Sequence, residues 1–524
     1  MMHLQKIPFR STRAFTEFFL KYIEKDSTLS SFYSRFPSVE NFKDQIKEKS
    51  KSFPDSTRQI LVKRLQQQYL KISKPSKEVT ENLQSLLQKN TFTVTTGHQL
   101  NIFTGPLYFI YKIVTVINAC KKLSAQYPDQ HFVPVYWMAS EDHDYEEIRY
   151  FRLYGKKYVW ETRQQGAVGQ FNPKELKSIL QKLPGDVSIF EEAYKKNELL
   201  SDAVRHYVNR LFGHEGLVVI DADDRELKKI FTPIIKEDVF AQVPFKHVTE
   251  TNANLETLGF HPQVNPREIN FFYLDKNLRS RIEKKGEDFI VIDTPLKFSR
   301  QALEKQVKEE PEKFSPNVIL RPLYQEMILP NLAYVGGPAE VVYWLELKSV
   351  FDHFHVPFPI LLPRNFAMVV DASMARKMNK TGLTTEDFFE EKNYLFNHWV
   401  TKNSSKNLSL GDVMMTQAQL LAEIQERCEK IDPTLVIMTR AETKKIQNTL
   451  EKIEKKMLRA EKRLHSDRLR QIDEVKDALF PNGSLQERTD NFLNFYQQDP
   501  DFIGKLLRHL DPFDFQFNVL THHD

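Results

Sequence analysis

The chain has 524 residues, of which 41% are hydrophobic and 27% charged; this composition is ordinary for a folded globular protein and excludes collagen-like, low-complexity and disordered classes. Its 74 lysines and arginines against 70 aspartates and glutamates leave a net charge of +4, too close to balance for a protein that binds nucleic acid through a broad basic surface. Cys120 and Cys428, the two cysteines, exclude a disulfide framework and a cysteine-based zinc site, and they indicate a cytoplasmic protein.

We expect neither a secretion signal nor a membrane anchor. Residues 1–26 mix charged and apolar residues at helical spacing and contain no uninterrupted apolar core. The most apolar stretch, 107–120, includes Lys112 and is too short to cross a bilayer. The sequence therefore predicts no membrane partner.

The first 90 residues predict surface helices, over 57–72 and 78–87, because charged and apolar residues alternate there with few helix breakers. At residue 91 the run TFTVTT predicts a strand, and the apolar segment 107–123 predicts a helix. Pro106 suits the first turn of that helix, since the N–H that proline lacks would have no intrahelical acceptor. This order of strand, loop and helix is typical of α/β proteins.

Four further apolar runs repeat this design and predict strands buried on both faces, as in a parallel sheet. They span residues 131–138, 217–220, 332–335 and 358–362. In doubly wound α/β sheets, ligands bind just beyond the carboxyl ends of the strands. We therefore predict an α/β core whose functional site is formed by the loops after these strands.

Two stretches interrupt the α/β pattern. Residues 149–171 and 270–298 alternate as β-hairpins do, and we interpret them as parts of two inserted α+β segments. The insertions are placed at residues 149–200 and 261–316. The core is then divided into residues 1–148, 201–260 and 317–383.

A long helix is predicted near the C-terminus, because no glycine or proline lies between Pro433 and Pro481. A helix over that whole interval would be about 70 Å long at 1.5 Å per residue. Residues 417–431 are its expected antiparallel partner. We place this helical coiled-coil domain at residues 384–500, and a C-terminal segment, 501–524, returns to the core.

Apolar residues of the long helix are spaced by alternating fours and threes, which is the heptad pattern of a coiled coil. They are Ile446, Leu450, Ile453, Met457, Ala460 and Leu464. The pattern slips near Leu469. The seam is closed either within the chain or by a second subunit, and a long helix lying on the domain is the alternative.

Glycine is scarce, at 16 residues, yet four glycines fall at or just beyond predicted strand ends. They are Gly97, Gly105, Gly336 and Gly337. A sharp turn or a close approach to a ligand would require glycine there, although the geometry of strand-to-helix turns is an equal explanation. Neither a GxxxxGK[ST] phosphate loop nor a GxGxxG motif occurs.

An acidic cluster follows the predicted strand at 131–138. It contains Glu141, Asp142, His143, Asp144, Glu146 and Glu147. Carboxylates crowded at a strand end could bind a metal, hold an ammonium group or act as a general base, and a solvated acidic loop is the alternative. We take Glu141, Asp142, His143 and Asp144 as candidate catalytic residues. His98, directly after Gly97, is a further candidate, although a structural hydrogen bond would also explain it.

Further candidate binding residues lie in the second half of the core, residues 317–383. Arg321, with Gln325 four residues on, could form two hydrogen bonds with a substrate carboxylate, or it could belong to a buried structural ion pair. Glu340 and Tyr343 follow Gly337 in the first turns of a predicted helix and could face the same cleft, although Tyr343 could equally serve helix packing.

Lys377 and Lys380 lie in KMNKT, which is similar to the mobile KMSKS loop that binds ATP phosphates in class I aminoacyl-tRNA synthetases. The surrounding sequence also fits a helix that ends at Gly382, followed by another helix capped by Thr384 or Thr385, and we favour this second interpretation.

Four segments, in this order, resemble the cysteine ligase family of bacillithiol biosynthesis, BshC: TTGHQLNIFTGPLYFIYK, WMASEDHDYEEI, LRPLYQEMILPNLAYVGGPAEVVYWLEL and DPFDFQFNVL. The resemblance implies that the chain joins the carboxyl group of cysteine to the amine of glucosaminyl-malate, the last step of bacillithiol synthesis. It also implies a nucleotidyltransferase-like Rossmann core with two connecting insertions, and a coiled coil that mediates homodimerisation.

The resemblance further implies an active-site region. In this sequence its residues are Gly97, His98, Gln99, Asn101, Thr104, Gly105, the acidic cluster, Arg321, Gln325, Gly336, Gly337 and Glu340. The wider superfamily binds ATP through an HIGH-type motif at the first helix, whereas the corresponding stretch here, 103–106, is FTGP and lacks both histidines. ATP therefore stays open as a co-substrate, and no metal is assigned.

Amide formation requires two kinds of assistance, because a carboxylate is a poor acyl donor and an ammonium group cannot attack it. Our hypothesis is that ATP activates the cysteine carboxyl group, while Arg321 or a lysine neutralises the malyl carboxylates. His143 or a neighbouring acid takes the amine proton, and backbone amides near Gly336 and Gly337 stabilise developing negative charge.

The alternatives are another acyl or nucleotidyl transfer to a different amine, and a non-catalytic coiled-coil scaffold with a degenerate nucleotide fold. The ligase hypothesis depends on one spatial expectation. Stretches around His98, His143, Arg321 and Gly337 must converge on a single crevice.

Overall fold

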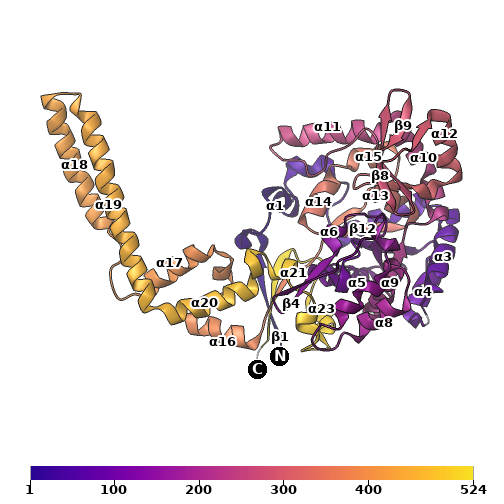
Figure 1. Cartoon of the computed structure of the whole chain (residues 1–524), viewed down its shortest axis with the longest axis horizontal. Helices are drawn as coiled ribbons and strands as arrows, with labels where there is room; N and C mark the ends of the chain where they lie inside the picture. Colours follow the sequence, from indigo (N-terminus) through magenta and orange to yellow (C-terminus); the bar gives the residue numbers. More distant parts are fainter. Residues whose placement is uncertain (1, 73, 523–524) are drawn as a thin grey trace. The chain divides into compact units, whose positions relative to one another are not determined.

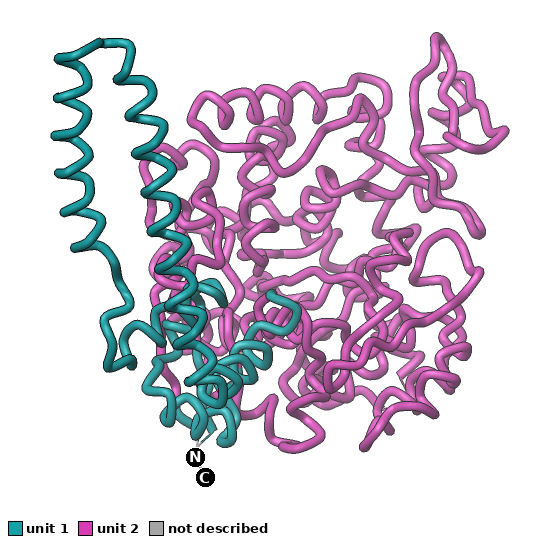
Figure 2. The backbone as a smooth tube through the Cα atoms, turned by 60° about the vertical axis from the view of Figure 1, so that its left-hand side comes forward, with its two compact units in different colours: residues 1–3, 369–483, 519–524 teal, residues 4–368, 484–518 magenta. Residues whose placement is uncertain are grey.

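The computed structural model describes residues 2–72 and 74–522, whose helices and strands are shown in Figure 1. They divide into two compact units (Figure 2). The core unit contains residues 4–368 and 484–518. The helical unit contains residues 369–483 and the described residues of 1–3 and 519–524. The chain passes between the units within strands β1 (Met2–Pro8), β14 (Phe366–Val370) and β15 (Gln516–His522), and also between Gly483 and Ser484. The three strands form a sheet of order β1-β15-β14.

A five-stranded parallel sheet, in the order β13-β12-β2-β3-β6, forms the centre of the core unit. Its strands are β2 (Thr91–His98), β3 (His131–Met138), β6 (Val218–Asp221), β12 (Asn331–Gly336) and β13 (Ile360–Pro363). All five predicted core strands are confirmed, with ends that differ by one or two residues. Every residue of β2 is buried, as expected for a strand covered on both faces.

The helix predicted over 107–123 is α5 (Tyr108–Gln126), which packs against β2 and β3. Val116 and Leu123 of this helix join Phe92 and Val94 of β2 in one apolar cluster. Two shorter helices flank β12 along the chain, α13 (Arg321–Ile328) before it and α14 (Pro338–Leu345) after it. The predicted strand, loop and helix pattern is therefore present. The carboxyl ends of the strands lead into the loops that the sequence predicts to form the functional site.

The N-terminal region is mostly helical, as predicted, with α1 (Glu17–Ile23), α2 (Phe42–Ser52), α3 (Asp55–Tyr69) and α4 (Lys77–Ser85). Helices α3 and α4 confirm the segments 57–72 and 78–87. The helical spacing noted within 1–26 is misleading at its start, because residues 2–8 form strand β1. A seven-residue segment is too short for periodicity to separate strand from helix.

Both predicted insertions contain antiparallel strands. In the first, β4 (Tyr150–Leu153) pairs with β5 (Lys156–Val159), and short helices α7 (Lys177–Leu180) and α8 (Ser188–Lys196) precede α9 (Leu200–Phe212). In the second, five strands form a sheet of order β10-β9-β8-β7-β11. They are β7 (Phe271–Asp275), β8 (Leu278–Lys285), β9 (Asp288–Val291), β10 (Lys297–Ser299) and β11 (Phe314–Pro316).

Other helices of the core unit connect these parts. They are α6 (Tyr145–Ile148), α10 (Arg225–Ala241), α11 (Val243–Thr257), α12 (Arg300–Glu309), α15 (Lys348–His353), α21 (Gln486–Thr489), α22 (Leu493–Tyr496) and α23 (Phe502–His509). The last three belong to the segment 484–518. Its Asn491 donates hydrogen bonds of 2.7 Å to the carbonyl oxygens of Phe103 and Gly105, and so holds the loop between β2 and α5.

The helical unit contains the predicted antiparallel hairpin, formed by α18 (Gly411–Ile431) and α19 (Leu435–Leu464). It also contains α16 (Ala372–Thr381), α17 (Lys392–Asn403) and α20 (Ser466–Leu479). The prediction of one continuous helix between Pro433 and Pro481 is wrong. The backbone leaves the helical region at His465 (φ −102°, ψ 18°), and Figure 1 shows α20 continuing in a different direction from α19.

Packing explains the break at His465 better than any local breaker does. Leu469, Ile472, Val475 and Leu479 of α20 are buried, and α20 packs against α16 and α17. The heptad seam of α19, in contrast, is left open in this chain, because Ile446 and Ile453 are 41% and 44% exposed. Among the described residues, no helix has the length and the apolar character that crossing a membrane would require.

Candidate active site

A cavity of about 370 Å³ lies at the carboxyl ends of β2, β3 and β12, where the sequence predicts the functional site. We call it the strand-end cavity. Nine of the predicted site residues line it: Gly97, His98, Gln99, Glu141, Asp142, Arg321, Gly337, Glu340 and Tyr343. The expected convergence therefore holds for the stretches around His98, Arg321 and Gly337. Glu147, the last acid of the acidic cluster, also lines the cavity.

His143 is the exception to this convergence. Its imidazole Nδ1 lies 2.6 Å from Nη1 of Arg279, and 45% of its side chain is exposed. It lines a separate depression with Asn277 and Leu278 rather than the strand-end cavity. The expectation that His143 faces the crevice is therefore wrong, because the turn after β3 directs Asp142 inward and His143 outward.

Several other predicted residues do not line the cavity. Asp144 caps α6, where its Oδ1 accepts from the N–H of Glu147 at 3.3 Å. Asn101 donates to the carbonyl oxygen of Glu147 at 3.0 Å. Gly105 has a φ of 62°, and a Cβ there would lie 2.5 Å from Cβ of Asn101, so this tight loop requires glycine. Thr104 and Gly336 line no part of the cavity either.

Lys377 and Lys380 belong to α16 of the helical unit and do not line the strand-end cavity. Nζ of Lys377 forms an ion pair with Glu474 at 2.7 Å. Helix α16 ends at Gly382, which has a φ of 69°, as the simpler interpretation of this segment predicts. A short 3-10 helix, Glu386–Phe389, follows it, and Oγ1 of Thr384 accepts from the N–H of Asp387 at 3.4 Å.

A buried ion pair between Lys112 of α5 and Glu340 of α14 forms part of the cavity wall, with 2.5 Å between Nζ and Oε2. Lys112 also donates to the carbonyl oxygen of Gly97 at 2.8 Å. Glu340 accepts from the hydroxyl of Tyr334 at 2.6 Å and from the N–H of Gly337 at 2.8 Å. Burial alone would raise the pKa of Glu340, but Lys112 and these hydrogen bonds lower it below its ordinary value.

This arrangement changes one expected role. The N–H of Gly337 already donates to Glu340, so it is not available to a developing negative charge in the cavity. Lys112 was not among the predicted site residues. The one charged residue in the apolar stretch 107–120 was the available signal, because a buried lysine requires a partner.

His98 is buried between Tyr108 and Phe109, with ring centroids 5.3 Å and 5.1 Å away. Burial, and then the charge of Lys112, lower the pKa of His98 to about 3, so its imidazole is neutral at pH 7. Its buried Nε2 has no hydrogen-bond partner among the described residues. His98 can therefore present a neutral ring nitrogen to a ligand, but it cannot supply a positive charge.

Arg321 supplies the positive charge that His98 cannot. Its guanidinium lies within 6 Å of three aromatic rings, those of Trp137, Tyr334 and Trp344, at 5.9, 5.4 and 5.8 Å. Nη1 donates to Gln325 at 3.1 Å, whereas the buried Nη2 has no hydrogen-bond partner among the described residues. Burial alone would lower the pKa of Arg321, but the neighbouring tyrosines raise it, so the group remains a cation.

Arg364, directly after β13, was not among the predicted site residues. Nη1 and Nη2 form a bidentate, buried ion pair with Glu487 at 2.9 and 2.5 Å. Its Nε is buried without a hydrogen-bond partner among the described residues. Glu487 comes from the segment 484–518, so this pair attaches that segment to the cavity wall. The position of Arg364 just after a predicted strand was the one feature of the sequence that could have identified it as a site residue.

Asp142 and Glu147 are the acids on the β3 side of the cavity. Burial would raise the pKa of Asp142, but hydrogen bonding with His143 and the charge of Arg279 hold it well below its ordinary value. Burial, and then the charges of Asp142 and Asp144, raise the pKa of Glu147. Asp142 is therefore an anion at neutral pH, and Glu147 binds a proton more readily than an ordinary glutamate does.

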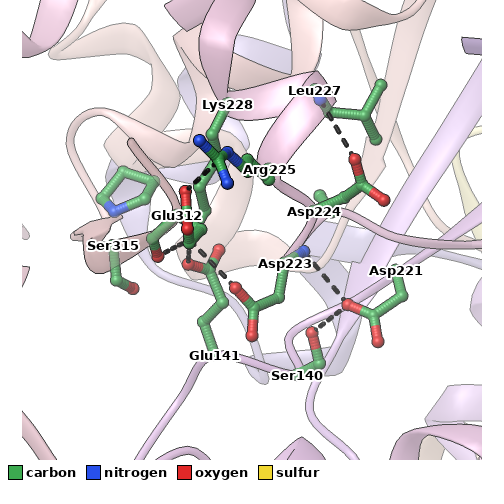
Figure 3. A network of polar contacts seen from close by, with 12 residues as sticks. Ser140, Glu141, Asp221, Asp223, Asp224, Arg225, Leu227, Lys228, Glu312 and Ser315 are labelled. Carbon is green, nitrogen blue, oxygen red and sulfur yellow. Dashed lines mark hydrogen bonds and ion pairs between the residues drawn. The ribbon is translucent and has the colours of Figure 1, made fainter. Parts of the chain in front are cut away.

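Glu141 belongs to a network that extends beyond the cavity (Figure 3). Nζ of the buried Lys228 contacts Glu141, Asp223 and the carbonyl oxygen of Glu312. Burial, and then the charge of Asp223, raise the pKa of Glu141 to about 7 against the opposing effect of Lys228. Within residues 2–72 and 74–522, no group of three or more His, Cys, Asp or Glu side chains is placed to hold a metal ion.

The cavity thus combines a buried arginine with an unused N–H, a neutral imidazole and two acids that are not tied to a lysine. Arg321 and Arg488 are lining cations without a carboxylate partner in the part of the chain that the structure describes, whereas Lys112, Arg279 and Arg364 are paired. An anionic group would bind at Arg321, and an amine would bind opposite, at Asp142 and Glu147.

Two family models match the chain. One is described as the N-terminal Rossmann-like domain of bacillithiol biosynthesis BshC and matches residues 2–365, and the other, its C-terminal coiled-coil domain, matches residues 367–522. A protein of Flavobacterium johnsoniae named "Putative cysteine ligase BshC" is 41% identical, with 98% of this chain and 99% of the relative covered. Proteins of the same name from Christiangramia forsetii and Cytophaga hutchinsonii are 40% and 38% identical, each with 98% of both chains covered. The predicted Rossmann-like core and coiled coil are confirmed.

Proposed function

This chain belongs to the bacillithiol biosynthesis BshC family, and on that premise we propose that it is a ligase joining the carboxyl group of cysteine to the amine of glucosaminyl-malate. The observation that carries the proposal is the unused N–H of Arg321 in a cavity that also holds acids. Both proposed substrates carry carboxylates and amines, so a site for them requires a fixed cation and nearby anions.

We assign the malyl carboxylates to Arg321. Its Nη2 is buried and lacks a partner, and an unpaired buried N–H of a charged group is costly unless a ligand binds it. The aromatic rings of Trp137, Tyr334 and Trp344 hold the guanidinium plane in position. The neutral Nε2 of His98 is suited to a hydrogen bond with an uncharged carbonyl group of the reacting acid.

We assign the amine to the β3 side of the cavity. Asp142, a firm anion, would hold the ammonium group, and Glu147, whose pKa is raised, would accept the proton that the amine must lose. Glu147 replaces His143 in this role, because His143 lies outside the cavity and bonds to Arg279. The nucleophilic nitrogen then attacks the activated cysteine carbonyl carbon, and the activating group leaves.

Activation of the carboxyl group needs a co-substrate, and we propose ATP. The loop at 103–106 lacks the histidines of an HIGH motif, so the phosphates of ATP need other partners in the protein. Arg488, an exposed cation without a carboxylate partner in the described structure, lines the same cavity and is our candidate for that role. The nucleotide product, AMP or ADP, distinguishes an acyl-adenylate from an acyl-phosphate.

We propose that the chain acts as a homodimer in the cytoplasm. Ile446 and Ile453 of α19, and Leu420 and Ile424 of α18, expose apolar side chains on a helical hairpin that a second copy could cover. Cys120 and Cys428 are both free thiols, as expected in a reducing compartment.

Reconstitution tests the proposed reaction. Purified protein with cysteine, glucosaminyl-malate and ATP should yield the amide product, detected by mass spectrometry, with one nucleotide released per product. Replacing glucosaminyl-malate by other amines tests the alternative of a different acyl or nucleotidyl transfer. A non-catalytic scaffold would give no product with any amine, and substitution of Arg321 would then have no effect in cells.

A further inference from the structure

A second cavity, of about 620 Å³, adjoins the strand-end cavity at the same edge of the parallel sheet. Ser140, the second residue after β3, lines both cavities. The second cavity is formed by α3, α9 and the loop after β6, together with the loop 164–171 and the turn 276–277. Its size is in the range of small-molecule sites.

Residues of the polar network in Figure 3 line both cavities. Glu141 lines the strand-end cavity, and Asp223 lines the second cavity. Both carboxylates contact Nζ of Lys228, which is buried between them. Ser140 donates to Asp221 on the side of the second cavity. A molecule that reached past Ser140 would therefore extend from one cavity into the other.

Three of the four cations that line the second cavity are paired with acids that also line it. Arg64 pairs with Asp224 at 2.7 Å, and Lys71 and Arg205 both pair with Asp202, at 2.7 and 3.0 Å. Because these three cations already have acids, they do not offer the unpaired positive charge that a phosphate or carboxylate would need, and the fourth lining cation, Lys276, is exposed at the turn 276–277. Its chemistry favours an uncharged polar group.

Hydrogen-bonding capacity in this cavity is nevertheless unused. Arg205 is 2% exposed, and its buried Nε has no hydrogen-bond partner among the described residues. Gln165, Gln170 and Asn277 line the cavity, and their side-chain amides make no hydrogen bond within the described structure. Each amide offers both a donor and an acceptor, which matches a ligand rich in hydroxyl groups.

The two insertions meet over this cavity. A Cβ on Gly166 would lie 2.7 Å from the backbone carbonyl carbon of Asn277, and a Cβ on Gly169 would lie 2.6 Å from Cβ of Ser140. The loop of the first insertion is therefore pressed against the hairpin tip of the second and against the shared Ser140. Loops packed this closely form a rigid cover over the second cavity.

We propose that the second cavity binds the sugar ring of the acceptor through its hydroxyl groups, while the amine and the malyl group extend past Ser140 into the strand-end cavity. The inference rests on the proposed function, because it locates one part of the acceptor assigned there. It gives the Gln and Asn side chains of both insertions a role in acceptor recognition, and it accounts for the unpaired Nε of Arg205.

Calorimetric binding of glucosaminyl-malate and of L-malate tests this division between the cavities. The double variant Gln170→Ala/Asn277→Ala changes two exposed side chains and should bind glucosaminyl-malate about 10-fold more weakly, as expected for two lost hydrogen bonds, with L-malate binding unchanged. Arg321→Gln should weaken binding of both ligands. Gln126→Ala removes an exposed amide that lines neither cavity and should match the wild type.

The outcomes separate the two proposals. If the double variant and Arg205→Lys both bind glucosaminyl-malate as the wild type does, the sugar site is overturned and the ligase proposal stands. If the double variant loses L-malate binding to the same extent, its effect is not on the sugar, and the inference is again overturned. If the wild type binds no glucosaminyl-malate, the proposed function fails and the sugar site fails with it.

Discussion

Lys49 of α2 and Glu326 of α13 form a fully buried ion pair, with 3.0 Å between Nζ and Oε2. Glu326 also accepts from Gln325 at 3.1 Å, and Gln325 in turn accepts from Arg321 at 3.1 Å. A chain of three contacts therefore links an N-terminal helix to the guanidinium that we assign to the acceptor carboxylates. Lys49 acts on the site through these neighbours and touches no part of the cavity.

Replacement of Lys49 by methionine should lower the free energy of unfolding by about 3–5 kcal/mol, because the buried carboxylate of Glu326 would lose its counter-ion. Chemical denaturation followed by tryptophan fluorescence measures this loss. The double variant Lys49→Met/Glu326→Gln removes both charges and should recover most of the stability. Equal stability of the single variant and the wild type would show that the pair is not needed for folding.

Arg321→Lys should raise the KM for glucosaminyl-malate by about 10- to 100-fold, which corresponds to the 1.5–3 kcal/mol typical of a hydrogen bond to a charged group. Lysine keeps the positive charge but cannot present the planar N–H groups that the three aromatic rings hold in place. Steady-state kinetics with varied acceptor measure the change. An unchanged KM would place the acceptor carboxylates elsewhere.

Glu147→Gln should lower kcat by about 10²- to 10⁴-fold, the usual contribution of a general base, while the KM for cysteine stays near that of the wild type. His143→Ala is the matched comparison from the same turn, and it should leave kcat within a few-fold, because His143 lies outside the cavity. The opposite ranking of these two variants would restore the imidazole as the proton acceptor and refute the role of Glu147.

Much of this fold could be predicted from local pattern. Four of the five core strands are apolar runs and the fifth, β2, is a threonine-rich run, and their parallel arrangement follows from the helices between them. Because parallel strands place their carboxyl ends at one edge, the positions of His98, Asp142 and Glu340 in the site followed from their places in the chain. The N-terminal strand β1 escaped this reasoning, because it is short and half-exposed.

The rest depends on contacts that no local pattern encodes. Arg364 and Glu487 are 123 residues apart, and nothing in either segment indicates that they pair. The inward direction of Asp142 and the outward direction of His143 are decided by a turn whose shape depends on Arg279 of the second insertion. The end of α19 at His465 likewise depends on the burial of α20, since no glycine or proline is present there.

His98 should make the folded state sensitive to acid. Its folded pKa of about 3 lies below its unfolded value near 6.5, so the unfolded chain binds one more proton between these two values. Stability that is present above pH 6.5 is therefore lost as the pH falls toward 3, with a slope of up to about 1.4 kcal/mol per pH unit from this residue.

The variant His98→Gln should show a flatter decline than the wild type over that interval, and unfolding free energies measured at several pH values between 4 and 7 test it. Parallel curves for the two proteins would mean that the pKa of His98 is the same in the folded and the unfolded chain, which would contradict the effect of burial on this imidazole.

The open heptad seam makes a prediction about assembly. Ile446 and Ile453 lie seven residues apart on one face of α19, and both remain more than 40% exposed after α18 has packed. The double variant Ile446→Asp/Ile453→Asp should convert the proposed dimer to a monomer, because two carboxylates would be buried in an apolar interface. Light scattering coupled to size-exclusion chromatography measures the mass, and circular dichroism checks that helicity is kept.

Asn448→Asp is the matched control for this assembly test, because it adds a carboxylate at an exposed polar position two residues from Ile446, where successive helical side chains point in different directions. It should remain a dimer. A double variant that still forms dimers would show that the seam is not the interface. A monomeric variant with full ligase activity would show that the strand-end cavity is complete within one chain, so that the coiled coil serves assembly and not catalysis.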